Sequence, residues 1–163
     1  MAATYEKIAA TTLGGASATV TFSSIPGTYT DLVLICTPLS ASVDNVVIQY
    51  NSDTSSNYSF TTFGGNGTTA SSNRGSNDSA PYVTYEVGNN TTQSNITINV
   101  MNYSNTTTYK TAICRGNNTA YGTDSTVVLW RDTNAITSIL LKQRGGNNLA
   151  TGSTFTLYGI KAA

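Results

Sequence analysis

Short runs in which apolar and polar residues alternate recur along the whole chain, and helical periodicity is almost absent. In the segment 17–23, a threonine separates Val20 from Phe22, and in ITINVMNY (96–103) isoleucine and valine alternate with threonine and asparagine. A period of two is typical of a strand that buries one side and exposes the other. The pattern predicts strands at residues 4–13, 17–23, 30–37, 45–51, 58–63, 82–87, 95–103, 108–115, 125–131, 136–143 and 154–161.

Clusters of glycine, asparagine and proline separate these strands and favour turns, for example at 13–15, 25–27, 115–118 and 145–148. Strands with one buried and one solvent-exposed side are typical of antiparallel sheets, because parallel sheets are covered on both sides. Many short strands without helices indicate an all-β fold, a single antiparallel β-sandwich with jelly-roll-like or Greek-key connections. A chain of 163 residues has room for one such domain, spanning 1–163.

One stretch breaks the pattern: FGGNGTTASSNRGSNDSAPY, residues 63–82, has no aliphatic side chain larger than alanine. We expect a long loop here, at one end of the sandwich, because neither flank has enough strands for a core of its own. Its only charges are Arg74 and Asp78. Loops on a rigid scaffold often bind ligands, but a mobile loop facing solvent is an equally good explanation. Our hypothesis is that residues 63–82 face a partner, either a neighbouring copy or the surface of a larger particle.

Aromatic residues gather at both ends of this stretch. Tyrosine buries a wide ring at low entropic cost and keeps a polar tip, which suits both protein interfaces and sugar stacking. For any single ring, the rim of the core is the better explanation, but the group favours an interface. The candidate contacts for a partner protein or a glycan are Tyr58, Phe60, Phe63, Arg74, Tyr82 and Tyr85. We expect Trp130, in the run VVLWRD, to lie in the core.

The composition separates this chain from disordered and nucleic-acid-binding proteins. Charged residues make up 10% of the chain and the formal net charge is zero, but ten tyrosines and many β-branched residues favour a folded protein. Lysine and arginine are scattered, whereas nucleic-acid binding needs a basic stripe that displaces counterions. No apolar run approaches the roughly 20 residues of a membrane helix. We therefore expect neither a nucleic-acid partner nor a membrane.

The amino-terminal segment and the cysteines indicate a reducing compartment. MAATYEKIAATTL has Glu6 and Lys7 where a signal peptide needs apolar residues, so we expect synthesis and assembly in a cytosol. Cys36 and Cys114 lie in apolar, strand-like runs. Buried free thiols are typical of such positions in a cytosolic protein, and a disulfide is the less favoured alternative.

The chain has no histidine, which removes the commonest general base, nucleophile activator and zinc ligand. The glycines at 64–67 lack the lysine and the following helix of a phosphate-binding loop. Asn51, Asp53 and Asn57 have a spacing loosely like that of a calcium loop, but the glycine and the bidentate glutamate are missing, so a turn explains them better.

A pair of carboxylates could still hydrolyse glycosides. The acidic residues are Glu6, Asp31, Asp44, Asp53, Asp78, Glu86, Asp124 and Asp132. Most of them fall at predicted turns and strand ends, where aspartate has a structural role. The residues therefore predict no enzyme, no catalytic residue, no metal and no cofactor.

Five stretches are similar to a group of small proteins and domains found among the virion proteins of tailed bacteriophages. They are YEKIAATTLGG, VTFSSIPGTYTDLVL, NYSFTTFGGNGTTASSNR, MNYSNTTTYKT with LWRDTNAITSILL, and the terminal GSTFTLYGI. The recurring features are a Tyr-Glu-x-Ile start, an Ile-Pro-x-Thr-Tyr-Thr-Asp-Leu turn, an Asn-Ala-Ile-Thr-Ser-Ile segment and a final Leu-Tyr-Gly-Ile. The resemblance implies a jelly-roll-like module on the outside of a virion, and it brings no catalytic residue.

These observations lead to one main expectation and two rivals. We expect a non-enzymatic virion structural protein that decorates or cements the capsid or forms part of a tail fibre or appendage. The resemblance implies that it lies on the virion surface and that its partners are other copies of itself, as a homotrimer, and other virion proteins. The first rival is a carbohydrate-binding module that holds host surface glycans through its tyrosines. The second is a small glycosidase built on the carboxylates.

Overall fold

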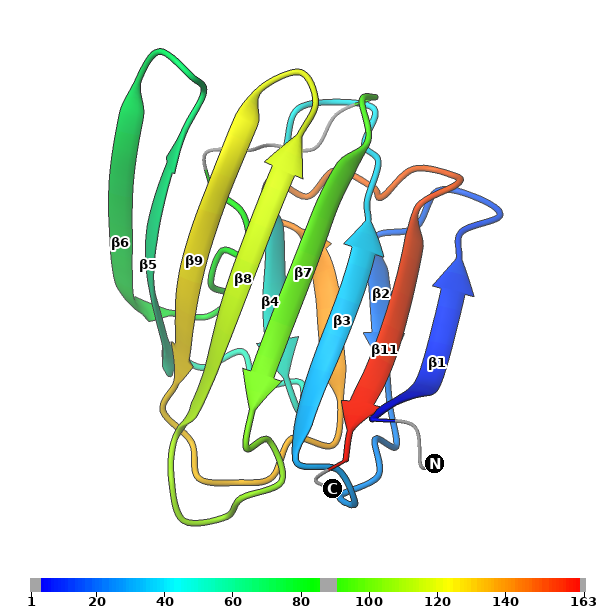
Figure 1. Ribbon diagram of the computed structural model, residues 1–163, viewed down its shortest axis with the longest axis vertical. Coiled ribbons are helices and arrows are strands. Elements are labelled where there is room, and N and C mark those ends of the chain that lie inside the picture. The colour runs from blue at the N-terminus through cyan, green and yellow to red at the C-terminus, as the bar shows by residue number, and fades with distance from the viewer. Residues whose placement is uncertain (1–3, 86–90, 162–163) are drawn as a thin grey trace.

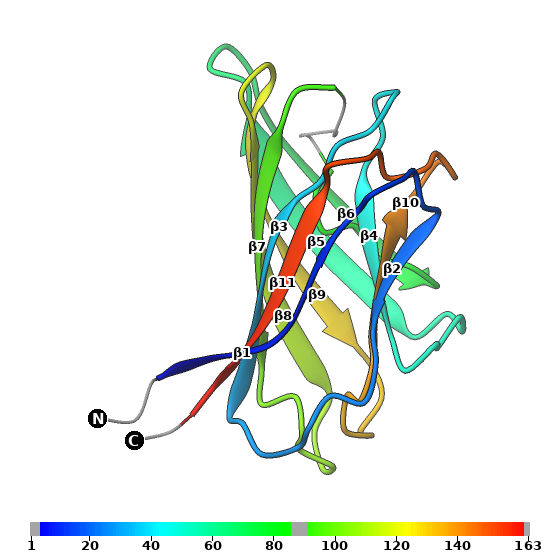
Figure 2. The same ribbon diagram turned by 90° about the vertical axis from the view of Figure 1, so that its right-hand side faces the viewer.

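The computed structural model describes residues 4–85 and 91–161, and these form eleven strands arranged in two facing sheets (Figure 1 and Figure 2). The strands are β1 (Tyr5–Thr12), β2 (Thr19–Phe22), β3 (Asp31–Thr37), β4 (Val46–Tyr50), β5 (Tyr58–Gly65), β6 (Ala70–Asp78), β7 (Ser94–Met101), β8 (Lys110–Asn118), β9 (Gly122–Trp130), β10 (Ile139–Gln143) and β11 (Thr154–Ile160). The described residues include no helix with the length and hydropathy of a membrane span.

The large sheet has eight strands in the order β1-β11-β3-β7-β8-β9-β5-β6, and the small sheet has three in the order β2-β10-β4. All pairings are antiparallel, so the predicted antiparallel β-sandwich is confirmed. From β1 to β5 the chain changes sheet at every step, and it does so again from β9 through β10 to β11. Such crossings bring distant segments together, as jelly-roll and Greek-key connections do.

The core lies between the sheets and follows the alternation seen in the sequence. On β7, Ile96, Ile98 and Val100 are buried, while on β2 Val20 and Phe22 point inward between exposed threonines. One continuous cluster joins side chains from both sheets. The indole of Trp130 is 1% exposed, so its predicted place in the core is confirmed.

The segment 63–82 differs from its prediction. The long loop is wrong, because β5 continues to Gly65 and residues 70–78 return along it as strand β6, leaving only a short turn between them. β6 is the edge strand of the large sheet, and most of its side chains are exposed or half-buried. An edge strand is held by backbone hydrogen bonds on one side and needs few apolar side chains, so its sequence lacks a strand pattern.

The predicted strand at 82–87 is also wrong in its described part. Residues 82–85 contain only an isolated bridge between Val47 and Tyr82, and residues 86 and 87 lie outside the described residues. The backbone amide of Ile48 donates to the carbonyl of Pro81, so this segment covers the free edge of β4. The other ten predicted strands coincide with strands of the structure, with shifted ends.

Candidate functional site

The outer face of the large sheet is the side turned away from the small sheet (Figure 2). The strand register aligns its outward side chains in rows across the sheet. One row contains Val33, Asn99, Ile113, Val127, Thr61 and Arg74, from β3 through β7, β8, β9 and β5 to β6. Because successive residues of a strand point to opposite sides, these side chains stand away from the core.

Large apolar side chains interrupt this otherwise polar face. Ile35 is 47% exposed, Val127 44%, Ile113 39% and Met101 37%. With the nearly covered Val33, they form what we call the outer-face patch (Val33, Ile35, Met101, Ile113 and Val127). Several large apolar side chains exposed on one face indicate an interaction site more often than isolated exposed residues do.

A shallow depression of about 560 Å³ adjoins the patch. Val33, Met101 and Ile113 of the patch line it, together with Tyr5 and Ile160 at the end of the β1–β11 pair. Tyr5 is 57% exposed, and its ring meets that of Tyr158 edge to face. The depression therefore joins apolar side chains of the central strands to those of the β1–β11 pair, with the polar residues Asp31, Asn99 and Arg115 among them.

Two arginines lie on the same face. Arg115 of β8 is opposite Ser125 of β9, which in turn is opposite Phe63 of β5, and Arg74 lies on β6. Within the described part of the chain, the ion pairs are Arg144–Asp78 and Lys161–Glu6, so neither outer-face arginine is paired there. The face thus combines apolar side chains with two cations that a partner's acceptors can reach.

Of the six predicted contact residues, Phe63 and Arg74 lie exposed on this outer face. Tyr58 is wrong as a surface contact, because it is fully buried, its ring is stacked on Trp130, and its hydroxyl accepts a hydrogen bond from the Tyr50 amide at 2.9 Å. Burial also raises the pKa of the Tyr58 phenol.

Phe60, Tyr82 and Tyr85 form the rim of the core, as expected of the single rings. The ring centroids of Tyr82 and Tyr85 are 4.8 Å apart, and Phe60 lies 5.2 Å from Tyr82. Phe60 is 6% exposed, and both tyrosines are half-buried against the core cluster. Their shared position is therefore structural, and the structure does not bring the six predicted residues together at one surface.

A charged cluster stands beside this rim. Arg144 donates to Asp78 Oδ1 at 2.8 Å and to the carbonyl of Ala80 at 2.6 Å, and its guanidinium lies 5.0 Å from the centre of the Tyr82 ring. Burial alone would raise the pKa of Asp78, but the hydrogen bond and charge of Arg144 lower it below its usual value. The cluster ties the ends of β6 and β10 together.

The described carboxylates serve the backbone and neighbouring side chains. Asp44 accepts from the Gly145 amide at 2.8 Å and from the Asn147 side chain at 2.9 Å, and Asp124 accepts from the Tyr85 amide at 2.7 Å. These bonds connect loops that are distant in sequence. Among the described residues, no three histidine, cysteine, aspartate or glutamate side chains lie close enough together to hold a metal ion.

The calcium-like spacing at residues 51–57 is a turn. Asn51 Oδ1 accepts from the backbone amides of Thr137 and Ser138. Asp53 Oδ2 accepts from the side-chain nitrogen of Asn57 at 3.0 Å and from the indole of Trp130 at 2.8 Å. These oxygens are directed at separate partners rather than at a common centre, so the alternative favoured by the sequence holds.

The structure is an all-β sandwich with exposed apolar side chains on the outer face of its large sheet. No protein-family model matches the sequence, and no curated protein matches it. Among solved structures, a toad ovary galectin in complex with thio-digalactose is similar, with 12% identity, a TM-score of 0.40, and coverage of 86% of this chain and 98% of the galectin. An alginate lyase mutant in complex with an alginate tetrasaccharide has 9% identity, a TM-score of 0.29, and coverage of 94% and 80%. At these values the likeness does not extend to a ligand or an activity.

Proposed function

We propose that this chain is a non-enzymatic structural module of a bacteriophage virion, which assembles with further copies of itself through the outer-face patch. The patch is the observation that carries the proposal. Four of its side chains, Ile35, Met101, Ile113 and Val127, are each more than a third exposed on a face that a free sandwich would cover with polar groups. Covering such side chains releases about 25 cal/mol for each Å² of apolar surface removed from water.

A second copy of the same chain suits this patch for two reasons. The formal net charge is zero and only 10% of residues are charged, so copies do not repel one another at long range. The patch also stands on β3, β7, β8 and β9, in the middle of the large sheet, so little conformational entropy is lost when it docks. Closed cyclic symmetry is the usual form of such assemblies, and a trimer agrees with the resemblance.

The motifs behind the phage resemblance meet in the fold and support a structural role. Tyr29, from the Ile-Pro turn, packs against Gly159 of the final Leu-Tyr-Gly-Ile, where an added Cβ would come within 2.3 Å of the ring. The Tyr29 hydroxyl donates to Glu6 Oε2 of the Tyr-Glu-x-Ile start at 3.3 Å, and Lys161 donates to Glu6 Oε1 at 2.8 Å. These motif residues therefore hold β1, the β2–β3 turn and β11 together, which supports a structural role for them.

The proposal covers location as well as assembly. Attachment to the exterior of the capsid or to a tail appendage, after assembly in the host cytoplasm, follows from the resemblance to virion proteins. Electron microscopy of virions that carry a labelled copy of the chain would test it directly. Label distributed over the capsid or at the tail supports the proposal, and virions without label contradict it.

Assembly through the patch is tested by measuring the mass of the purified protein in solution with light scattering. We expect a closed oligomer for the natural chain and a monomer for the double variant Ile113→Lys, Val127→Lys. The matched control is Val43→Lys, in the connection between β3 and β4, because Val43 is 59% exposed but lies outside the patch. A monomeric natural chain, or a double variant that stays oligomeric, would overturn assembly through this face.

A further inference from the structure

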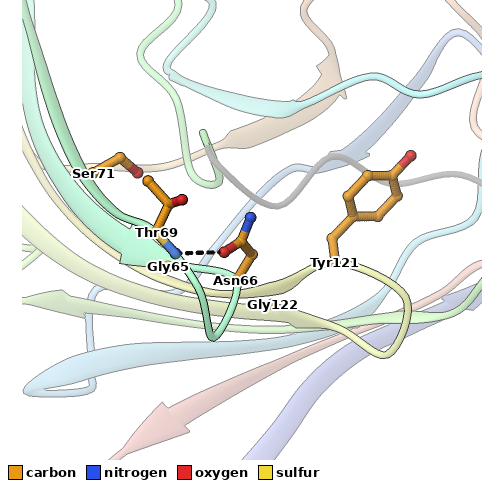
Figure 3. Close-up of a pocket in the computed structure, with 6 residues that line it drawn as sticks. All are labelled: Gly65, Asn66, Thr69, Ser71, Tyr121 and Gly122. Atoms are coloured by element: carbon orange, nitrogen blue, oxygen red, sulfur yellow. Dashed lines mark hydrogen bonds between the residues drawn. The ribbon is translucent and has the colours of Figure 1, made fainter.

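A small cavity lies where the tips of two hairpins meet. The β5–β6 and β8–β9 tips are neighbours in the large sheet and extend beyond the ends of the small sheet (Figure 1 and Figure 2). The cavity measures about 140 Å³. Figure 3 shows the six residues that line it: Gly65, Asn66, Thr69, Ser71, Tyr121 and Gly122.

Glycines make the floor of this tip pocket. Gly122 has a φ of +155°, and a Cβ there would lie 2.2 Å from the carbonyl oxygen of Gly65. A Cβ on Gly65 would lie 2.9 Å from the carbonyl of Thr69. Only glycine permits the two tips to approach so closely, and the floor is therefore bare peptide backbone.

Asn66 presents a fixed hydrogen-bond donor at the tip pocket. Its Oδ1 accepts from the amides of Thr68 and Thr69 at 3.0 and 2.8 Å, and from the Thr68 hydroxyl at 2.8 Å. With the oxygen held inside the turn, the side-chain nitrogen points away from it, into the space between the Thr69 and Tyr121 side chains in the view of Figure 3. A ligand's acceptor can therefore bind without any rearrangement of this side chain.

Tyr121 supplies the apolar wall. It is 45% exposed, and its ring stands across the pocket from Thr69 and Ser71 (Figure 3). Hydroxyl groups on one side and an aromatic ring on the other suit a ligand that has both C–H groups and many hydroxyls. All six lining residues are uncharged, so an anionic ligand has no counter-charge there.

We propose that the tip pocket binds one neutral hexopyranose unit, at the end of a glycan chain. The ring of the sugar would stack on Tyr121, and its hydroxyls would accept from Asn66 Nδ2 and exchange hydrogen bonds with Thr69 and Ser71. The small volume restricts the bound part to a single sugar ring. This activity goes beyond assembly and adds recognition of a surface carbohydrate to the structural role.

The tip pocket and the outer-face patch are made of different residues. None of the six residues that line the tip pocket belongs to the patch or lines the depression beside it. Contact between copies through the patch therefore does not use the residues of the pocket. The two proposals can fail separately, since one concerns mass in solution and the other sugar binding.

The chain contains a matched control for both key residues. Asn105, in the connection between β7 and β8, makes the same turn as Asn66, with its Oδ1 accepting from the amides of Thr107 and Thr108 at 2.7 and 2.9 Å. Tyr109 follows it and is 55% exposed. This connection lies at the opposite end of the sandwich from the tips (Figure 1).

The test is saturation-transfer NMR on the whole chain with the methyl glycosides of glucose, galactose, mannose and N-acetylglucosamine. We expect transfer to the ring protons of at least one of them. Tyr121→Ala should reduce its affinity by about tenfold or more, which corresponds to the loss of one aromatic contact. Asn66→Asp keeps the acceptor oxygen that holds the turn but removes the donor, and should weaken binding similarly. Tyr109→Ala and Asn105→Asp should leave binding unchanged.

Three results would overturn the proposal. The first is the absence of transfer to any of the four glycosides. The second is equal binding by Tyr121→Ala or Asn66→Asp and the natural chain. The third is a preference for methyl glucuronide, an anionic sugar, over all four neutral probes. Amide spectra of each variant would show whether the sandwich is folded, so that a binding loss can be assigned to the pocket.

Discussion

Ile113 of β8 lies directly opposite Val127 of β9 on the outer face of the large sheet, and the two side chains are 39% and 44% exposed. On the other side of the same two strands, Ala112 pairs with Val128, and both are fully buried. Two adjacent strands therefore carry apolar pairs on both of their faces. The inner pair completes the core of one chain, and the outer pair lies in the patch through which we propose that copies associate.

This division predicts different effects on folding and on assembly. Ile113→Thr with Val127→Thr should lower the free energy of unfolding of the monomer by less than about 1 kcal/mol, because half-exposed side chains bury little further surface on folding. The same double variant should dissociate more readily than the natural chain. Ile98→Ala, at a fully buried position, should cost about 2–5 kcal/mol.

Urea unfolding at concentrations where the protein is monomeric measures the first quantity, and light scattering against concentration measures the second. If the threonine variant lost as much folding free energy as Ile98→Ala, the outer pair would belong to the core of a single chain. That result would contradict the proposal that the patch is an interface between chains.

The sequence predicts correctly those strands in which apolar residues lie on one face and polar residues on the other. On β7, isoleucine and valine point inward and threonine and asparagine point outward, so the alternation marks both the strand and its buried side. Strand β6, ASSNRGSND, has no such division. Its place is decided by backbone pairing with β5, which has no local signature in the side chains.

The candidate site was harder to predict than the fold. Ile113 and Val127 each stand beside an inward apolar residue, and a run of consecutive apolar residues does not reveal which ones face solvent. The aromatic candidates are grouped by their place around a predicted loop, and this segment is the β5–β6 hairpin in the structure. Only the register between strands distant in sequence shows that Phe63 and Arg115 share a face.

A second prediction concerns the carboxylate of Asp53. It accepts hydrogen bonds from the Trp130 indole at 2.8 Å, the Ser55 amide at 2.8 Å and the Asn57 side chain at 3.0 Å. Burial alone would raise the pKa of Asp53, but these bonds outweigh it, and the pKa lies below its usual value. A carboxyl whose pKa is lowered by folding stabilises the folded state above its unfolded pKa, and this contribution is lost as the pH falls through the folded pKa.

Asp53→Asn should therefore destabilise the protein at neutral pH by about 1–3 kcal/mol, because one of the two accepting oxygens is lost. The difference in unfolding free energy from the natural chain should shrink as the pH falls from about 4, the pKa of an unfolded aspartate, through the lower pKa of folded Asp53. Thermal unfolding across this range measures the difference. Asp132→Asn, at a turn where one oxygen accepts from the Asn134 amide, is the control and should change little. A difference that stays constant with pH would contradict a stabilising role for the charge.

The two thiols should resist modification in the folded protein. Cys36 and Cys114 are 1% and 0% exposed, and both are free. Burial raises the pKa of Cys36 to about 12, and it also raises the pKa of Cys114. Because the thiolate is the reactive form, iodoacetamide should modify neither residue under native conditions at neutral pH.

In guanidinium chloride without reductant, iodoacetamide should alkylate both thiols. The mass of the intact protein should then increase by the mass of two labels. Omitting the denaturant provides the control. Alkylation that requires prior reduction would show that the two cysteines form a disulfide, and rapid labelling of the native protein would show that one of the strands opens.

The last prediction tests whether β6 is part of the packed fold or a dispensable edge. Gly75 is opposite Phe60 in the register, and a Cβ at this position would lie 2.4 Å from the ring's Cε1 atom. The ring cannot move freely, since it packs on Tyr82 and Tyr85 at centroid distances of 5.2 and 6.1 Å. Gly75→Ala should therefore cost about 1–3 kcal/mol, the usual cost of overpacking a core.

Ser72→Ala, on the outward side of the same strand, is the matched control and should stay within about 0.5 kcal/mol of the natural chain. Combining Gly75→Ala with Phe60→Leu should recover part of the loss, because the shorter side chain makes room for the methyl group. Chemical unfolding of the two single variants and the double variant gives this coupling directly. A harmless Gly75→Ala would mean that β6 separates from β5 in solution, and residues 63–82 would then be the loop that their composition predicts.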